Sequence, residues 1–401
     1  MLAPIVKITA TTTWLYAVAL FSAIVLIEPS PMEIAAILLS VLILCRYGLG
    51  KFPRSLLISI TAFIYLNYFS ILFSHQTDVA FASSLIRSYL YLFLVVLASF
   101  LAICSKTTIA TFLKFVIIGA LLNAMVIIAA YITNHELLDF AYRDAHKLRF
   151  KGFFKDPNVL GVHLILALSL IVIFDWPIKL KIFASSIILF STYLTYSRAS
   201  WAGVLVVPAL FYTFLFLHNK YIKTRMLKYF FLGIITVTVV STLFLFVSNN
   251  SITKHLEYGH SRLSFQSYDS DRFYNQLKTI DAIVQKPFGH GAGSTVHSKG
   301  GILDYNDPHN VYLKIAAETG LPSLLIYLYI IVYLAVISFS LGKAGHILGY
   351  LLLANHLYFI LLGFIIDTIH WRVIILVWAL IVGLHIKERM FKNESLVATT
   401  N

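Results

Sequence analysis

The sequence predicts an all-α polytopic membrane protein with about twelve transmembrane helices and a long, partly helical loop on the non-cytoplasmic side. Three observations lead to this prediction. Hydrophobic residues make up 59% of the 401 positions and charged residues only 12%, whereas a soluble domain carries about 25% charged residues. Apolar runs that could cross a bilayer recur along the chain. Basic residues gather in alternate short loops.

The apolar runs define the predicted helices in order. Their cores are 14–28, 32–45, 55–73, 86–103, 112–132, 158–174, 179–195, 199–217, 228–247, 321–341, 346–366 and 370–386. No small-residue cleavage site follows the first core, so we expect it to remain as a span. The cores 179–195 and 199–217 together are too long for one span, so a tight turn is predicted at 196–198.

The distribution of Lys and Arg predicts the orientation of these helices. With the N-terminus in the cytoplasm, the outer short segments 29–31, 74–84 and 367–369 contain no Lys or Arg. An even number of spans then puts both termini in the cytoplasm. We divide the chain into N-terminal helices (1–135), a core (136–330) that includes the long outer loop 248–309, and C-terminal helices with a tail (331–401).

Composition excludes several classes of protein. The two cysteines, Cys45 and Cys104, form no zinc or disulfide pattern. The net charge of +13 is assigned to helix ends and lipid phosphates, so no nucleic acid partner is expected. One outer loop, 133–157, is basic although the topology rule disfavours it: Arg143, Lys147, Arg149, Lys151 and Lys155. These charges indicate either contacts with anionic lipid or a phosphate-bearing substrate.

The segment DPHNVYL at 307–313 predicts a helix that begins at the outer surface and ends at Gly320. Asp307 is expected at the N-cap and Pro308 at the first helical position. His309 would then lie in the first turn, where the helix dipole disfavours the imidazolium form and leaves a possible general base. The alternative is a histidine that only makes a hydrogen bond near the membrane.

Two other segments, DPN at 156–158 and Ser197-Arg198, also predict outer helix starts. Helix N-termini attract anions. Arg198 and Arg272 are candidate phosphate ligands because a guanidinium group binds phosphate bidentately. Headgroup contacts or structural salt bridges are the alternative for each arginine.

The outer loop 248–309 is predicted to contain a helix that starts near Ser270 or Asp271 and stops at Lys286-Pro287. Phe273, Leu277, Ile280 and Val284 would lie on one face, so the helix is expected along the membrane surface.

The glycine-rich segment GHGAG at 289–293 is interpreted as a tight turn, because no strand precedes it and no Lys-Ser/Thr pair follows. A metal site formed by nearby acidic and histidine residues is conceivable, but their spacing matches no known ligand pattern, so no metal is expected. These residues are His290, His297, Asp304, Asp307 and His309.

Four segments together resemble the O-antigen ligase and polymerase superfamily of bacterial membrane glycosyltransferases. They are GFFKDPN at 152–158, YSRASW at 196–201, KPFGHG at 286–291, and His309-Asn310 followed by ETG at 318–320. The resemblance covers residues of about 150–330, and the N-terminal helices are similar only in hydropathy.

The resemblance implies transfer of a glycan from an undecaprenyl diphosphate carrier to an acceptor hydroxyl, at the periplasmic face of the bacterial inner membrane, with no metal or other cofactor and with inversion. It implies that His309 is the general base and that Arg198 and Arg272 bind the diphosphate. Arg149, Lys151 and Arg87 are expected as further substrate contacts. Asn158 and Asn310 are also expected at the substrate, since they stand in the matching motifs.

The acceptor is not readable from the sequence. A ligase that transfers to lipid A–core is favoured, and an O-antigen or exopolysaccharide polymerase that joins carrier-linked repeats is the alternative. Transfer to protein is a third branch of the superfamily. A membrane transporter is a further alternative from another class, which the near absence of mid-span charges disfavours.

Overall fold

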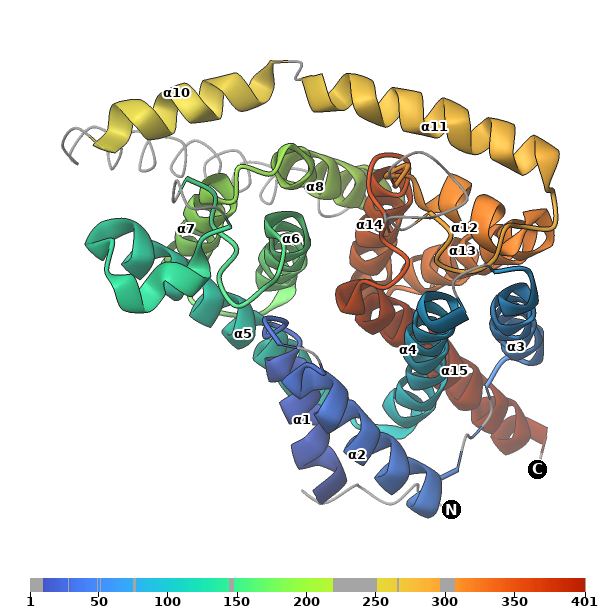
Figure 1. The fold of residues 1–401 in the computed structure, drawn as a ribbon. Coiled ribbons are helices and arrows are strands. Elements are labelled where there is room, and N and C mark those ends of the chain that lie inside the picture. Colours follow the sequence, from blue (N-terminus) through green and yellow to red (C-terminus); the bar gives the residue numbers. More distant parts are fainter. Residues whose placement is uncertain are drawn as a thin grey trace. The chain divides into compact units, whose positions relative to one another are not determined.

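The computed structural model describes residues 10–27, 29–48, 50, 52–74, 77–143, 148–218, 251–264, 267–295 and 307–400. The chain divides into two compact units. The first comprises Met1–Leu42, Cys104–Ser264 and Gly345–Asn355, and the second comprises Ile43–Ile103, Phe265–Ala344 and His356–Asn401. Figure 1 shows the helices of both units. The functional division at about residues 135 and 330 stays a prediction.

The described part of the first unit is built from helices. They are α1 (Ala10–Phe21), most of α2 (Pro31–Arg46), α5 (Lys106–Thr133), the short η2 (Glu136–Ala141), α6 (Pro157–Ile173), α7 (Ile178–Leu194), α8 (Arg198–His218), α10 (Ser251–Leu263) and the start of α14 (Ile347–Leu362).

Small residues allow the helices of the first unit to approach closely. A Cβ atom at Gly119 of α5 would lie 2.8 Å from the Leu20 carbonyl oxygen. A Cβ atom at Gly161 of α6 would collide with the Ser200 hydroxyl of α8. Membrane helices commonly associate through such small residues, because packing replaces the hydrophobic driving force. The α6–α8 contact therefore fixes the start of α8 beside the start of α6.

The second unit is also helical over its described residues. Its helices are α3 (Arg54–Phe69), the short η1 (Ser70–Phe73), α4 (Thr77–Ile103), α11 (Ser267–Gln285), α12 (Val311–Thr319), α13 (Leu321–Lys343), the end of α14 and α15 (Arg372–Thr400). Helix α15 packs along α4, where a Cβ atom at Gly383 would lie 2.8 Å from the Leu101 Cβ atom. Buried Trp378 of α15 donates a hydrogen bond of 3.0 Å to His356 Nδ1 of α14.

Every predicted span core except 228–247 coincides with a helix, and 228–247 lies outside the described residues. The turn predicted at 196–198 is confirmed between α7 and α8, with Tyr196 at a φ of 49°. The first core was predicted too long, because α1 ends at Phe21. Beyond it the chain turns, and Val25 N–H donates to the Phe153 carbonyl (2.7 Å). That contact replaces another helical turn.

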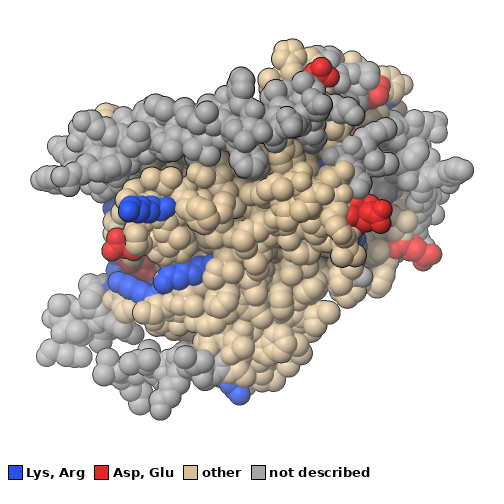
Figure 2. All heavy atoms as spheres, turned by 90° about the vertical axis from the view of Figure 1, so that its left-hand side faces the viewer, with Lys and Arg blue, Asp and Glu red and all other residues tan. Residues whose placement is uncertain are grey.

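The apolar helices identify a multi-pass membrane protein. Five described helical segments are long and apolar enough to cross a bilayer, and three shorter apolar helices accompany them. A total of twelve spans stays a prediction. On the face shown in Figure 2, most of the described surface is uncharged, with few Lys, Arg, Asp or Glu side chains. Such a surface fits contact with lipid.

Candidate functional site

Helix α12 begins three residues later than predicted. Asn310 is its N-cap, and the Asn310 side-chain oxygen accepts hydrogen bonds from the N–H groups of Tyr312 (3.0 Å) and Leu313 (3.1 Å). The prediction that Asp307 caps the helix and that His309 lies in its first turn is therefore wrong. Asparagine and aspartate are equally good caps, and the Asp307 carboxylate is engaged by the His309 N–H and by Lys314 instead. The predicted end at Gly320 is confirmed by its φ of 90°.

His309 stands immediately before this cap in a left-handed backbone conformation, with a φ of 48°. This conformation costs a residue other than glycine roughly 1–2 kcal/mol, so neighbouring contacts must hold it. Asp307 Oδ1 accepts a hydrogen bond of 2.7 Å from the His309 N–H. The next residue, Asn310, is fixed by its capping hydrogen bonds. The position of His309 is thus set by backbone contacts on both sides.

Helix α11 brings Arg272 into the surroundings of His309. The predicted helix in this loop is confirmed, since α11 spans Ser267–Gln285. Gln276, one turn after Arg272, donates a hydrogen bond of 3.2 Å to the Pro308 carbonyl. Burial lowers the pKa of His309, Asp307 opposes that shift, and the positive charge of Arg272 lowers the pKa further. The imidazole is therefore neutral at neutral pH, as a general base must be.

Lys314 of α12 lies between two carboxylates. Its side chain is 7% exposed, and its amino nitrogen lies 2.7 Å from Asp307 Oδ2 and 2.8 Å from Asp367 Oδ2. Burial alone would lower the pKa of Lys314, but the carboxylates Asp367, Glu318 and Asp307 raise it well above its ordinary value. Burial alone would raise the pKa of Asp367, but Lys314 lowers it well below its ordinary range. Lys314 and Asp367 therefore both carry charge at neutral pH.

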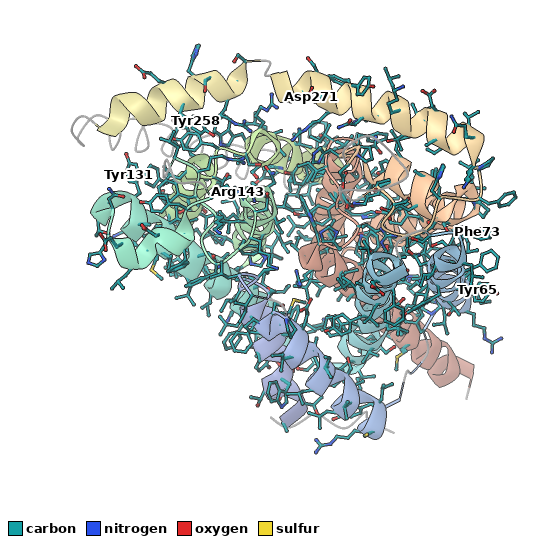
Figure 3. All side chains as sticks on the ribbon, in the orientation of Figure 1. Tyr65, Phe73, Tyr131, Arg143, Tyr258 and Asp271 are labelled. Carbon is teal, nitrogen blue, oxygen red and sulfur yellow. The ribbon has the colours of Figure 1, made fainter. Side chains whose placement is uncertain are left out.

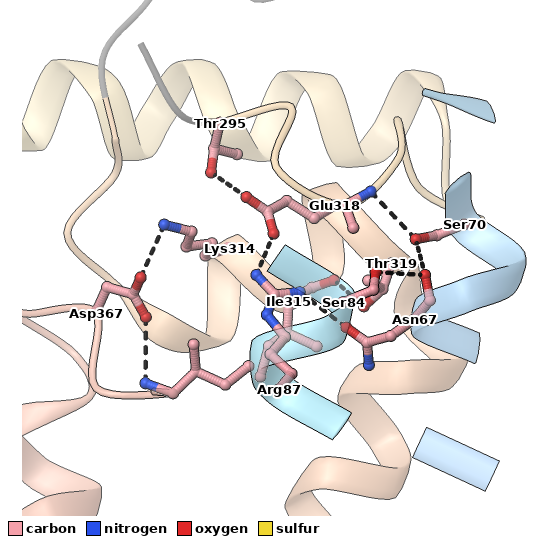
Figure 4. A network of polar contacts seen from close by, with 12 residues as sticks. Asn67, Ser70, Ser84, Arg87, Thr295, Lys314, Ile315, Glu318, Thr319 and Asp367 are labelled. Carbon is pink, nitrogen blue, oxygen red and sulfur yellow. Dashed lines mark hydrogen bonds and ion pairs between the residues drawn. The ribbon is translucent and has the colours of Figure 1, made fainter. Parts of the chain in front are cut away.

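A second buried ion pair, between Arg87 of α4 and Glu318 of α12, lies one turn further along (Figure 4). Arg87 Nη1 also donates to the Asn67 side-chain oxygen (2.9 Å), and Glu318 accepts a hydrogen bond of 2.6 Å from Thr295 Oγ1. Asn67 in turn accepts hydrogen bonds at its carbonyl from Ser70 and Ser84. This network joins α3, α4 and α12 behind the His309 segment.

The glycine-rich segment is a structural turn, as expected. His290 N–H donates to the Ala317 carbonyl (2.7 Å), and Gly291 N–H donates to the Glu318 carbonyl (2.9 Å). Gly289 has a φ of 96°, and a Cβ atom there would lie 2.6 Å from the Glu318 carbonyl oxygen. The glycines thus let the segment lie flat against the end of α12.

The described residues contain no group of three or more His, Cys, Asp or Glu that could hold a metal ion. Of the residues considered for such a site, His297 and Asp304 lie outside the described residues.

In the first unit, the starts of α6 and α8 are joined side by side. Asp156 is the N-cap of α6, and its carboxylate accepts from the Asn158 N–H (2.7 Å), as predicted. Ser197 caps α8 by accepting from the Ser200 N–H (3.3 Å), and its hydroxyl donates to the Asn158 side chain (2.7 Å). Arg198, half-buried, is the first residue of α8.

Two arginines converge on the turn that leads into α8. Arg149 donates to the Thr195 carbonyl and Arg262 to the Tyr196 carbonyl, each at 3.3 Å. Burial lowers the pKa of Arg149, and the positive charge of Arg262 lowers it further. Arg149 Nη2 is buried and has no hydrogen-bonding partner among the described residues. This arrangement leaves a guanidinium group able to accept an anion.

The loop that carries Arg149 is fixed by backbone contacts of its own. Arg143 binds the exposed Asp156 carboxylate at 3.0 Å, and Figure 3 labels Arg143 in this region. The Lys151 N–H donates to the Ala141 carbonyl (2.7 Å). Arg149 and Lys151 therefore lie on a loop whose backbone is held in place.

The predicted site residues fall into two groups, which we describe separately. The second unit brings together His309, Arg272 and Asn310, with Arg87 in the network behind them, and the first unit contains Arg198, Arg149, Lys151 and Asn158. The sequence prediction missed Arg262, Lys314, Asp367 and Glu318. For Lys314 and Glu318 a signal existed, because charged residues within an apolar helix beside a membrane mark functional or paired positions.

One cavity of about 430 Å³ in the second unit is lined by Arg54, Tyr333, His385 and Arg389, among others. It lies at the start of α3, whereas the opposite end, η1, contacts the glycine-rich segment through Ser70 and Ala292 (3.1 Å). The cavity is therefore separate from the surroundings of His309.

Comparison with known families agrees with the resemblance seen in the sequence. Residues 183–328 match the model of a family described as O-antigen ligase. The match contains Arg198, Arg272 and His309, and it confirms the resemblance to the O-antigen ligase and polymerase superfamily. No curated protein matches the chain.

Proposed function

We propose that this chain, as a member of the O-antigen ligase and polymerase superfamily, transfers a glycan from undecaprenyl diphosphate to an acceptor hydroxyl at the periplasmic face of the bacterial inner membrane. Both termini are then cytoplasmic. Lipid A–core is the acceptor we favour. The observation that carries the proposal is His309, an imidazole with a lowered pKa that is held in the surroundings of the Arg272 guanidinium group, immediately before the cap of α12.

In the proposed reaction, His309 removes the proton from the acceptor hydroxyl. The resulting oxygen attacks the anomeric carbon of the donor sugar and forms the new glycosidic bond. The bond between that carbon and the diphosphate oxygen breaks, and undecaprenyl diphosphate leaves with the electron pair. A single displacement of this kind inverts the anomeric configuration. General base catalysis contributes typically 10²–10⁴-fold to the rate.

The negative charge that grows on the leaving diphosphate needs fixed positive groups. We assign this role to Arg272 and Arg198, which can stabilise the developing charge without a metal ion. Arg149 supports the same role, because its Nη2 is buried without a partner among the described residues. Lys151 adds charge to the same loop, and Asn158 orients the α8 turn through Ser197 (2.7 Å).

Two predicted substrate contacts acquire more specific roles in this proposal. Asn310 caps α12 through its side-chain oxygen, so we propose that it orients His309. The Arg87 guanidinium group is buried and occupied by Glu318 and Asn67, so we propose that Arg87 supports α12 and does not touch the diphosphate.

The glycan profile of a deletion strain tests the proposal and separates its alternatives. Loss of a ligase leaves unattached lipid-linked polymer, and loss of a polymerase leaves single lipid-linked repeats. Complementation with His309→Ala should reproduce the deletion profile, since the base is absent. A wild-type profile from His309→Ala would contradict the catalytic assignment, and a defect in uptake or export of a solute would favour a transporter.

A further inference from the structure

Lys314 of α12 is a buried charged residue at a position where an apolar side chain would be expected. Its neighbours along α12, Val311, Ile315, Ala316 and Ala317, are buried apolar residues. An apolar side chain at position 314 would avoid the desolvation cost of a buried ammonium group. The charge at this position therefore points to a role that an apolar residue could not perform.

The two carboxylates that bind Lys314 come from separate loops. Asp307 precedes α12, and Asp367 lies between α14 and α15. Each uses one oxygen for the ammonium group and the other for a backbone N–H two residues further on. Asp307 Oδ1 accepts from His309 N–H at 2.7 Å, and Asp367 Oδ1 accepts from Ile369 N–H at 3.2 Å. Lys314 thus clamps two aspartate turns together.

This arrangement differs from a carboxylate that orients an imidazole ring. Both oxygens of Asp307 are engaged, one by the His309 backbone and one by Lys314. Asp307 can therefore hold the left-handed backbone of His309 only as firmly as Lys314 holds Asp307. Lys314 is held in turn by Asp367. The position of the imidazole therefore depends on a chain of contacts that runs from Asp367 through Lys314 to Asp307.

We propose that Lys314 and Asp367 are positioning residues, which fix Asp307 and thereby hold His309 in the conformation that reaches the acceptor hydroxyl. The inference rests on the proposed function. It assigns no contact with substrate to either residue. Lys314 also faces His309 together with Arg272, Asp307 and Asp367, so its charge affects the protonation of the imidazole.

The decisive variant is the double substitution Lys314→Met with Asp367→Asn. It removes one positive and one negative charge, so the net charge is unchanged, and the Asp307 carboxylate, whose side chain is 27% exposed, loses its anchor. We expect kcat to fall roughly 100-fold, the usual cost of misplacing a catalytic group by about 1 Å. The donor KM and the thermal unfolding midpoint should stay near those of the wild type.

Two further variants keep the test decisive if the double variant folds poorly. Asp367→Asn alone keeps one acceptor oxygen and puts an NH2 group in place of the other, so either Lys314 or Ile369 loses its acceptor, and it should lower kcat about tenfold at unchanged donor KM. Lys314→Met alone should move the acid limb of kcat to higher pH, because a positive charge near His309 is lost. A purely structural role for Lys314 would change stability and leave both readouts unaltered.

The matched control is the Lys392–Glu388 pair of α15, with side chains 64% and 23% exposed and a separation of 3.3 Å. Lys392→Met with Glu388→Gln should leave kcat unchanged. His309→Ala is assayed in parallel. Suppose that His309→Ala is inactive while both the double variant and Asp367→Asn keep kcat within twofold of wild type. The positioning role is then overturned, and the proposed function stands. If His309→Ala is also fully active, the proposed function fails with it.

Discussion

Glu318→Gln is the substitution whose effect on stability follows most directly from the structure. The side chains of Arg87 and Glu318 are 5% and 0% exposed. The substitution keeps the volume of residue 318 and removes its charge, which leaves the Arg87 guanidinium buried without a counter-charge. Removing one partner of a buried ion pair typically costs about 3–5 kcal/mol. We expect a loss of this size in the free energy of unfolding.

The double variant Arg87→Met with Glu318→Gln should recover most of that loss, because replacing both ions is often close to neutral. The coupling energy between positions 87 and 318 is then about 3 kcal/mol. The exposed Arg143–Asp156 pair provides the contrast, with side chains 47% and 33% exposed. Arg143→Gln should cost no more than about 1 kcal/mol, as is usual for surface pairs.

The assay is reversible denaturant unfolding of the purified protein in mixed micelles, followed by far-ultraviolet circular dichroism and analysed as a double-mutant cycle. A loss below about 1 kcal/mol for Glu318→Gln, or no coupling with Arg87, would refute the reasoning. The double variant should also bind donor as tightly as the wild type. Weakened donor binding would instead assign Arg87 to the diphosphate.

Three further predictions concern the site and its surroundings. The pKa of His309 is lowered, and only the neutral imidazole acts as a base. We therefore expect kcat to fall on acidification with a midpoint below about pH 6.5, the ordinary pKa of histidine. A midpoint above this value would contradict the assignment. EDTA should leave the transfer rate unchanged, whereas full loss restored by one divalent cation would require a metal-dependent step. Leu277, on the exposed apolar stripe of α11, should meet the bilayer surface. With Cys45 and Cys104 replaced by serine, a nitroxide at position 277 should be less accessible to an aqueous nickel chelate than one at exposed position 278, which lies about 100° further around the helix; equal accessibility would exclude membrane contact there.

The helices of this protein were largely predictable because hydropathy and the glycine at position 320 are local signals. The α7–α8 turn followed from length alone, since one span cannot hold both runs. Where the structure departs from the prediction, a distant contact is responsible. Helix α1 ends early because Val25 pairs with Phe153, and no local pattern in the first helix contains that information.

The site was predictable in its residue types more than in its geometry. Asp307 and Asn310 are both good caps, and only the ion pair between Asp307 and Lys314 shows why Asn310 takes that role. Arg262 carried no local signal, because its importance comes from a contact with Tyr196, which lies 66 positions earlier. Asp367 is similarly distant from Lys314 in the sequence.

The central claim is that His309 drives direct transfer of a glycan from undecaprenyl diphosphate. The most direct measurement is the release of undecaprenyl diphosphate by the purified protein from a carrier-linked glycan, with and without acceptor, for the wild type and His309→Ala. We predict acceptor-dependent release, a product of inverted anomeric configuration, and a loss of at least about 100-fold in kcat for His309→Ala. Release by His309→Ala at the wild-type rate, or a product of retained configuration, would contradict it.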